Sequence, residues 1–252
     1  MTRSNGPEQQ PNFTYSHGAV IRGDSTRKQI ALVFTGDEFA DGGWYIPDIL
    51  KRDDIRASFF FTGNFYRNPA FKNIIRNLKA NGHYLGPHSD QHLLYCSWEN
   101  RDSLLVTRSE FTRDLNDNYT AMAGFGISRE EARIFLPPYE WYNETIAGWT
   151  RDMGVRLVNF TPGTISHADY TTPEMKNYRS SADIYESITR FEQTSPSGLN
   201  GFILLLHMGT SQSRTDKMYY RLPELISYLQ RKKYELVKID ELLHTNQTAT
   251  TL

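Results

Sequence analysis

Short apolar runs alternate with longer segments of helical spacing along most of this chain. The runs are nearly continuous and rich in β-branched and aromatic side chains, which is typical of strands buried on both faces of a parallel sheet. The predicted strands occupy 29–35, 56–62, 83–86, 133–136, 156–160, 201–207 and 234–237.

The intervening segments place apolar residues three or four positions apart, as a helix with one buried face requires. In 70–80, for example, Phe71, Ile74 and Leu78 share one face, and Asn81-Gly82 follows as a stop. The predicted helices are 45–51, 70–80, 103–123, 143–153, 181–191 and 218–232.

Repetition of strand and helix about seven times implies a parallel sheet with right-handed crossovers. Closed on itself, this α/β arrangement is a deformed (β/α)7 barrel, and an open doubly wound sheet is the alternative. The length of 252 residues suits a single barrel. We expect an N-terminal extension (1–27), a barrel domain (28–243) and a C-terminal tail (244–252).

Composition and charge exclude several classes of protein. Lys and Arg total 28 against 29 Asp and Glu, a net charge of −1, so no basic excess is available to bind a nucleic-acid backbone. Cys96 is the only cysteine, which excludes an intramolecular disulfide framework. The sequence contains no glycine-rich phosphate loop, and its apolar run 202–206 is too short to span a membrane.

Polar residues gather where the predicted strands end. An acidic turn follows 29–35, two histidines follow 83–86, a Pro-Pro-Tyr-Glu segment follows 133–136, and His207 ends 201–207. Parallel strands bring their carboxyl ends to one face, where α/β folds build their sites. We therefore expect one functional site at this face.

His88 and His92 are spaced i, i+4, which in a helical turn places both imidazoles on one face. Two histidines and one carboxylate suit Zn²⁺, Fe²⁺, Co²⁺ or Ni²⁺ and leave positions for water and substrate. The alternative is a pair of surface histidines. Asp37, Glu38 and Asp41 lie in one turn, where one or two would reach a metal, or where all serve as a solvated turn or helix cap.

His207 ends the apolar run GFILLLH. It is either a core histidine bonded to a backbone carbonyl or a general acid, because imidazole titrates near neutral pH. Asp169 is a candidate to orient His207; the alternative is a solvated loop carboxylate.

Together these segments resemble the polysaccharide deacetylases of carbohydrate esterase family 4, which remove acetyl groups from chitin, peptidoglycan and acetylxylan. The family's His-Ser/Thr-x-x-His motif is matched by HSDQH (88–92), Arg-Pro-Pro-Tyr-Gly by LPPYE (136–140) and Leu-Leu-His by ILLLH (203–207). VFTGDE (33–38) occupies the position of the family's Thr-Phe-Asp-Asp-Gly motif, and NFTPGT (159–164) occupies the position of its Asp-Trp element. The resemblance implies a deformed (β/α)7 barrel.

The resemblance also implies a divalent metal, Zn²⁺ first with Co²⁺ or Ni²⁺ as alternatives, bound by Asp37, His88 and His92. It makes His207 the general acid that protonates the leaving group. The backbone N–H of Tyr139, together with the metal, would hold the oxyanion.

Aromatic residues near the strand ends are candidates to stack on sugar rings, although they could equally be packing. The predicted substrate-binding residues are Trp44, Tyr139 and Trp141.

Two positions depart from the family pattern. Gly36 stands where the family has its catalytic base, and Leu136 replaces the Arg that pairs with that base. Loss of both is coherent, because a buried Arg without its partner is costly. Glu140, Glu38 and Asp41, in falling order, are candidates for a replacement base. Attack without a separate protein base and loss of catalysis are the other two explanations.

We predict a metal-dependent hydrolase that removes acetyl groups from an oligosaccharide or polysaccharide. A catalytically silent carbohydrate-binding barrel and a small-amide metal hydrolase are the alternatives. A polysaccharide substrate favours a periplasmic or extracellular location. Residues 1–12 contain no apolar stretch, so we expect the signal sequence to be absent from this chain. A cytoplasmic location is the alternative.

Overall fold

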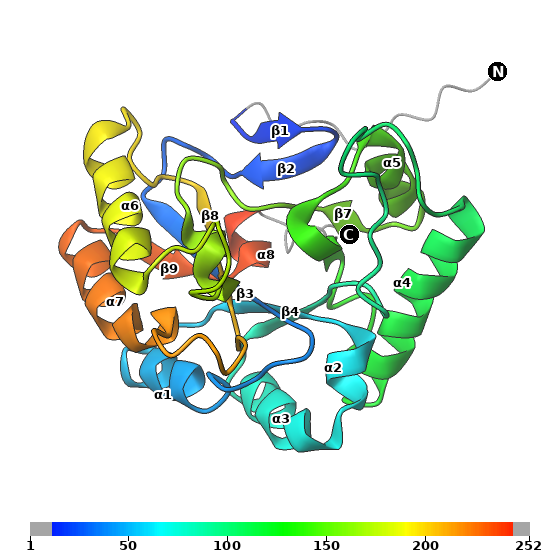
Figure 1. Cartoon of the computed structure of the whole chain (residues 1–252), viewed down its shortest axis with the longest axis horizontal. Helices are drawn as coiled ribbons and strands as arrows, with labels where there is room; N and C mark the ends of the chain where they lie inside the picture. The colour runs from blue at the N-terminus through cyan, green and yellow to red at the C-terminus, as the bar shows by residue number, and fades with distance from the viewer. Residues whose placement is uncertain (1–11, 244–252) are drawn as a thin grey trace, which may run out of the picture.

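The structure is a computed structural model that describes residues 12–243. Most of the strands lie in the centre of the molecule, and helices surround them on the outside (Figure 1). The predicted α/β fold with parallel strands is confirmed. The ring of strands is a deformed barrel, because among the described strands hydrogen bonding does not run continuously around the ring.

The main sheet is centred on β3 (Gln29–Gly36). This strand pairs in parallel with β4 (Ser58–Phe61) and β8 (Phe202–His207), and β5 (Tyr84–Pro87) pairs with β4. β9 (Glu235–Val237) pairs with the first part of β3. Almost all of β3 is buried, as its unbroken apolar run predicts.

Two shorter strands, β6 (Ile134–Phe135) and β7 (Arg156–Leu157), form a separate parallel pair. The N–H of Leu136 donates to the Pro87 carbonyl at 3.3 Å and links this pair to β5. Every predicted strand is therefore present, although those on this side of the ring are shorter than expected.

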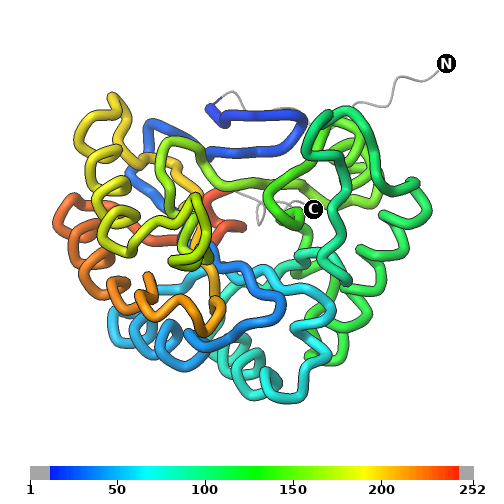
Figure 2. The backbone as a smooth tube through the Cα atoms, viewed as in Figure 1, coloured from blue at the N-terminus to red at the C-terminus, as the bar shows by residue number. Residues whose placement is uncertain are grey.

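An unpredicted hairpin lies beside β7 and β8. Its strands, β1 (Thr14–Ser16) and β2 (Ala19–Arg22), pair antiparallel. Val20 of β2 forms a parallel bridge to Val158, and β2 also contacts β8. Figure 2 shows this blue hairpin against the green segment that leaves β7. Strands of three and four residues are too short to show a period of two, which is why the sequence pattern did not reveal them.

The division into 1–27, 28–243 and 244–252 stays a prediction. Residues 1–11 of the expected extension and the whole expected tail lie outside the described residues. The remaining part of the extension holds β1 and β2, and Ala19 and Val20 of β2 are buried in the core.

Six helices of eight or more residues cover the described part of the barrel, and each overlaps a predicted helix. They are α1 (Tyr45–Arg52), α3 (Lys72–Ala80), α4 (Arg108–Ala123), α5 (Glu144–Asp152), α6 (Ser181–Thr194) and α7 (Leu222–Arg231). The shorter segments are α2 (Gly63–Arg67), α8 (Ile239–Leu242), and the 3-10 helices η1 (Pro69–Phe71), η2 (Pro138–Glu140), η3 (Ser166–Tyr170) and η4 (Met218–Arg221). Within residues 12–243, no helix combines the length and apolar character that crossing a membrane requires.

The helix predicted over 103–123 begins five residues late, as α4. Thr107 and Glu110 form a capping box, each side chain accepting the other residue's backbone N–H. The residues before it belong to a tight loop in which Leu104 forms an antiparallel bridge with Cys96. The predicted start of this helix was wrong because the bridge between Leu104 and Cys96 holds the preceding residues in a loop and competes with helix formation.

The side chains of β3 alternate between two apolar cores. Ala31 and Val33 belong to the cluster inside the barrel, whereas Ile30, Leu32 and Phe34 belong to the cluster under the helices. Alternation at every second residue is the geometry of a strand between two layers. Polar residues begin where β3 ends, so the strand delivers the acidic turn to the barrel rim.

Candidate active site

The polar residues that follow the strands meet at one face of the barrel. Thr35 of β3 lies in register with His207 of β8, so the turn that begins with Asp37 starts at the level of His207. β5 ends at Pro87, and His88 follows directly. Electrostatic influence of His207 on His88 is consistent with one shared site.

His88 is buried, with 2% of its surface exposed. Its Nδ1–H donates to the Leu136 carbonyl at 2.7 Å, and because a carbonyl only accepts, Nε2 keeps its lone pair. Burial, together with neighbouring His92, lowers the pKa of His88 well below its ordinary value. The neutral imidazole that results is the form that binds metals.

The ring centroid of His92 lies 5.2 Å from that of His88. The expected helical turn is wrong here: Ser89 and His92 have φ values of 73° and 54°, in the left-handed region. The loop wraps around Asp114 of α4, whose Oδ1 accepts two consecutive N–H groups at 3.2 and 3.0 Å. The two imidazoles are therefore brought together by a loop fixed to α4 and not by helical periodicity.

Asp37 accepts a hydrogen bond from the Thr62 hydroxyl at 2.7 Å. Burial lowers the pKa of His92, and the Asp37 carboxylate opposes that effect, which places the two groups near each other. Two imidazoles and a carboxylate fit a divalent metal in chemistry. Among residues 12–243, however, no three His, Cys, Asp or Glu side chains are placed to hold one ion together. The set of Asp37, His88 and His92 stays a prediction.

The other two carboxylates of the acidic turn have different surroundings. Glu38 is exposed. Asp41 accepts hydrogen bonds from the Thr210 N–H at 2.7 Å and the Tyr219 hydroxyl at 2.9 Å, and it pairs with Lys217 at 2.8 Å. Asp41 therefore ties the turn to the loop after β8, which leaves little lone-pair capacity for catalysis.

His207 is held by Asp169 of η3. The carboxylate accepts Nδ1–H of the imidazole at 2.6 Å and the backbone N–H of His207 at 2.9 Å, one with each oxygen. Burial lowers the pKa of His207, but the Asp169 carboxylate, with a smaller contribution from Glu140, more than compensates, so the pKa lies above its ordinary value. The predicted contact between Asp169 and His207 is therefore confirmed.

Glu140 lies close enough to this pair to be affected by both members. Burial raises the pKa of Glu140 to about 7, while His207 lowers it and Asp169 raises it. Tyr139 and Glu140 have φ values of 58° and 54°, and Asn159 donates to the Glu140 carbonyl at 2.9 Å. Consecutive left-handed residues are strained, and such strain clusters at functional sites.

Gly36, which stands where the family has its catalytic base, is closely packed by aromatic rings. A Cβ atom there would lie 3.0 Å from ring carbons of Phe61 and Phe65, and these two rings stack with centroids 4.0 Å apart. The side chain of Leu136 is fully buried in the apolar cluster inside the barrel. Apolar packing thus fills the places of both missing polar partners.

The structure brings together two of the three predicted sugar-stacking residues. The ring of Tyr139 lies 4.4 Å from that of His92, and Trp98 contacts both Tyr139 and Trp141. Trp44 instead lies in a groove on the outside of the barrel. The other residues that line this groove belong to α1, to α3 and to the end of α3: Tyr45, Pro47, Asp48, Lys51, Asn77 and Asn81.

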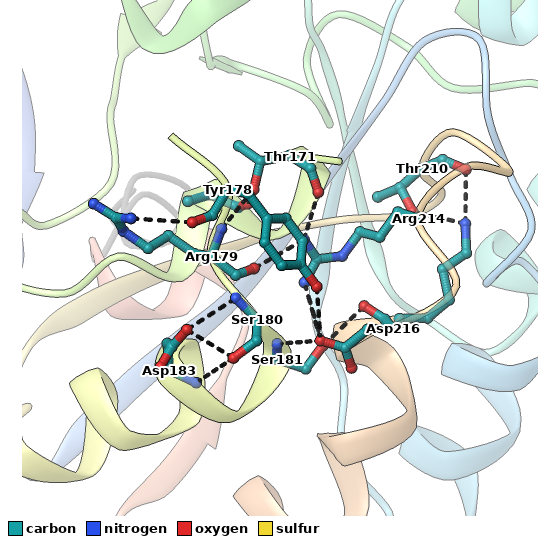
Figure 3. Close-up of polar contacts among 11 residues, drawn as sticks. Thr171, Tyr178, Arg179, Ser180, Ser181, Asp183, Thr210, Arg214 and Asp216 are labelled. Atoms are coloured by element: carbon teal, nitrogen blue, oxygen red, sulfur yellow. Dashed lines mark hydrogen bonds and ion pairs between the residues drawn. The ribbon is translucent and has the colours of Figure 1, made fainter. Parts of the chain in front are cut away.

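Sequence reasoning missed Arg214, which is fully buried at 0% exposure. Its guanidinium donates to the carbonyls of Thr171 and Arg179 at 2.6 and 3.0 Å and to the Ser181 hydroxyl at 3.3 Å (Figure 3). Arg214 thereby fastens the segment after Asp169 to the loop after His207. One arginine in a polar loop carries no pattern from which this role could be read.

Comparisons with known proteins relate this chain to one family. The model of the polysaccharide deacetylase family matches residues 22–158. A chitin deacetylase from Colletotrichum lindemuthianum is 28% identical to this chain over 206 residues, covering 78% of this chain and 72% of that protein.

Solved structures share the fold. Bacillus subtilis PdaA, a family 4 carbohydrate esterase, has a TM-score of 0.70 at 19% identity, over 92% of this chain and 87% of that one. A CE4 family pseudoenzyme from Bacillus anthracis has a TM-score of 0.67 at 19% identity, over 91% and 70%. At such identities the likeness establishes the fold alone.

Proposed function

The chain belongs to the polysaccharide deacetylase family, and we propose on that premise that it is a metal-dependent hydrolase removing acetyl groups from an oligosaccharide or polysaccharide. Its departures at Gly36 and Leu136 make it a divergent member. The observation that carries the proposal is the pairing of two imidazoles with lowered pKa values, His88 and His92, at the rim of the barrel that also carries the His207–Asp169 pair.

We expect Asp37, His88 and His92 to hold the metal, with Zn²⁺ first and Co²⁺ or Ni²⁺ as alternatives. His88 would bind through Nε2, because Nδ1–H is already donated to the Leu136 carbonyl. A divalent metal at such a site polarises the acetyl carbonyl and lowers the pKa of water.

His207 acts in this proposal as the general acid. Asp169 keeps a proton on Nδ1, so Nε2–H of the protonated ring is free to donate to the leaving amine or alkoxide. The raised pKa of His207 favours the protonated form near neutral pH. The backbone N–H of Tyr139 is proposed to donate to the oxyanion.

Glu140 acts in this proposal as the base that accepts a proton from the attacking water. Of the three candidate carboxylates, Asp41 is occupied by Thr210, Tyr219 and Lys217, and Glu38 is exposed. A carboxylate whose pKa burial raises to about 7 is a strong enough base to act at neutral pH and is still substantially ionised there.

The test is acetate release from acetylated xylan and from N-acetylated chitin oligosaccharides. We expect release with added Zn²⁺, Co²⁺ or Ni²⁺, loss of release on chelation, and no release by His88→Ala. An absence of metal-dependent release from every acetylated glycan would contradict the proposal. A glycan substrate also leads us to propose a periplasmic or extracellular location, checked by fractionating the native host.

A second candidate is a carbohydrate-binding barrel without hydrolysis. It is favoured by the Phe61–Phe65 stack that fills the space beside Gly36. Binding of acetylated oligosaccharides that is unchanged by chelation and produces no acetate would support this candidate over the first.

A further inference from the structure

We infer that Trp98 forms, with Tyr139, a stacking subsite for a second sugar ring next to the one that is deacetylated. The inference rests on the proposed glycan substrate and deepens it, because it requires a substrate of at least two sugar units. A free acetylated monosaccharide would leave this surface uncovered.

The first argument is exposure next to the site. Trp98 is 56% exposed and Tyr139 is 44% exposed, although large aromatic rings usually bury most of their surface. Their centroids are 5.7 Å apart with an interplanar angle of 79°, and the Tyr139 ring is 4.4 Å from that of His92. Two open aromatic rings, nearly at right angles, therefore continue outward from a proposed metal ligand.

The second argument is that the loop presenting Trp98 is well fixed. The N–H of Ser97 donates to the Ser103 carbonyl at 2.9 Å, and the Ser97 carbonyl accepts Nε1–H of Trp141 at 3.1 Å. Next in the chain, Cys96 is buried and bridges Leu104. The exposure of Trp98 is thus a property of an ordered loop. A pre-organised ring loses little conformational entropy when a ligand binds.

The third argument is that Trp141 packs behind Trp98 and leaves the faces of Trp98 and Tyr139 open. Trp141 is partly buried, with the ring of Trp98 5.3 Å away and the guanidinium of Arg101 3.6 Å from its ring centroid. Arg101 is itself held, because its carbonyl accepts a hydrogen bond from Asn143 at 3.0 Å. Trp141 therefore supports Trp98, and the open faces left for a ligand belong to Trp98 and Tyr139. The axial C–H groups of a pyranose ring match such apolar faces, and its equatorial hydroxyls stay hydrated.

The experiment is isothermal titration of the full chain with chitohexaose and with acetylated xylohexaose, each compared with its monosaccharide. We expect the wild-type chain to bind at least one hexasaccharide more tightly than its monosaccharide. Trp98→Ala should weaken that binding about ten-fold, and Trp98→Phe should weaken it less. Tyr220→Ala, which removes an aromatic ring that is 59% exposed on η4, is the matched control and should bind as the wild type does.

Three results would overturn the inference: wild-type affinity in Trp98→Ala, a loss caused by Trp44→Ala instead, or no hexasaccharide binding by the wild-type chain. Acetate release, measured in parallel, reports on the proposed hydrolase separately. Binding that depends on Trp98 without acetate release would support the subsite and contradict the hydrolase. Acetate release with unchanged binding in Trp98→Ala would contradict the subsite alone. Thermal melting of each variant confirms that it is folded.

Discussion

The candidate site has an acid side, formed by His207 and Asp169, and a proposed metal side, formed by Asp37, His88 and His92. The two sides differ in how completely contacts within the chain hold their residues together. On one side, His207 engages both oxygens of Asp169, and buried Arg214 fastens the segments that carry them. On the other, His88 is fixed through Nδ1, but Asp37 bonds to Thr62, and no three-ligand cluster is formed in the described part of the chain. The acid side is thus held by direct contacts within the chain, whereas in our proposal the metal side is completed by a bound cation.

The same comparison applies to the missing base. The family's base and its Arg partner would lie at Gly36 and Leu136, and both places are now apolar. The nearby ionisable group is Glu140, which is electrostatically linked to His207 and Asp169. The catalytic carboxylate has therefore moved, in our proposal, from the metal side of the site to the acid side.

The largest effect is expected when the metal side is broken. His88→Ala should lower acetate release about 10⁴-fold, since metal polarisation supplies several kcal/mol of transition-state stabilisation. Chelation of the wild-type chain should do the same and should be reversed by added Zn²⁺. His17→Ala, which removes an exposed histidine, is the control. If chelation leaves the activity intact, the metal side is not a metal site.

Replacing Glu140 tests where the base now lies. Glu140→Gln should lower kcat/KM about 10³-fold, within the usual range for general-base catalysis. Because the base acts when deprotonated, wild-type activity should rise as pH increases through about 7, the raised pKa of Glu140. It should fall again above the raised pKa of His207, which acts when protonated.

Glu38→Gln is the matched control for that substitution, because Glu38 is an exposed carboxylate in the acidic turn. Its pH profile should keep the rise near neutral pH. A Glu140→Gln variant that kept the same rise would rule out Glu140 as its source.

Removing Arg214 should break the support of the acid side. Arg214→Met leaves the carbonyls of Thr171 and Arg179 without this donor, and loss of one buried charged partner typically costs about 3 kcal/mol of unfolding free energy. Urea denaturation measures the loss. Arg231→Met, on the exposed surface of α7, should stay within about 0.5 kcal/mol of the wild type. Equal stability of both variants would show that Arg214 supports little.

The smallest of these effects is expected from Asp169→Asn. The amide keeps the shape of the carboxylate but loses the charge that raises the pKa of His207, so kcat should fall about 10²-fold. The alkaline limb of the pH profile should also move to lower pH, which a merely structural defect would not cause. An alkaline limb at the same pH as in the wild type would show that Asp169 does not raise the pKa of His207.

Much of the fold could be predicted because its signals are local. Strand runs such as 201–207 and helix faces such as that of 70–80 depend on neighbours a few positions away. The hairpin β1–β2 could not be predicted, because β2 is fixed by a distant partner, Val158. The late start of α4 could not be predicted either, because Leu104 pairs with Cys96 in a loop instead of joining the helix. In each case a backbone bridge outweighed the helical or strand pattern of the sequence.

For the candidate site, the sequence predicted which residue types gather at the strand ends, but it did not predict which partner each side chain contacts. The sequence alone determined the family resemblance, the barrel, and the histidines at the strand ends, because motif spacing and periodic burial are written in consecutive residues. Only the tertiary structure decided that Asp41 bonds to Thr210, 169 positions away, that Asp169 meets His207, and that Phe61 and Phe65 fill the space beside Gly36. These outcomes depend on which surfaces folding brings together, and no local pattern records that.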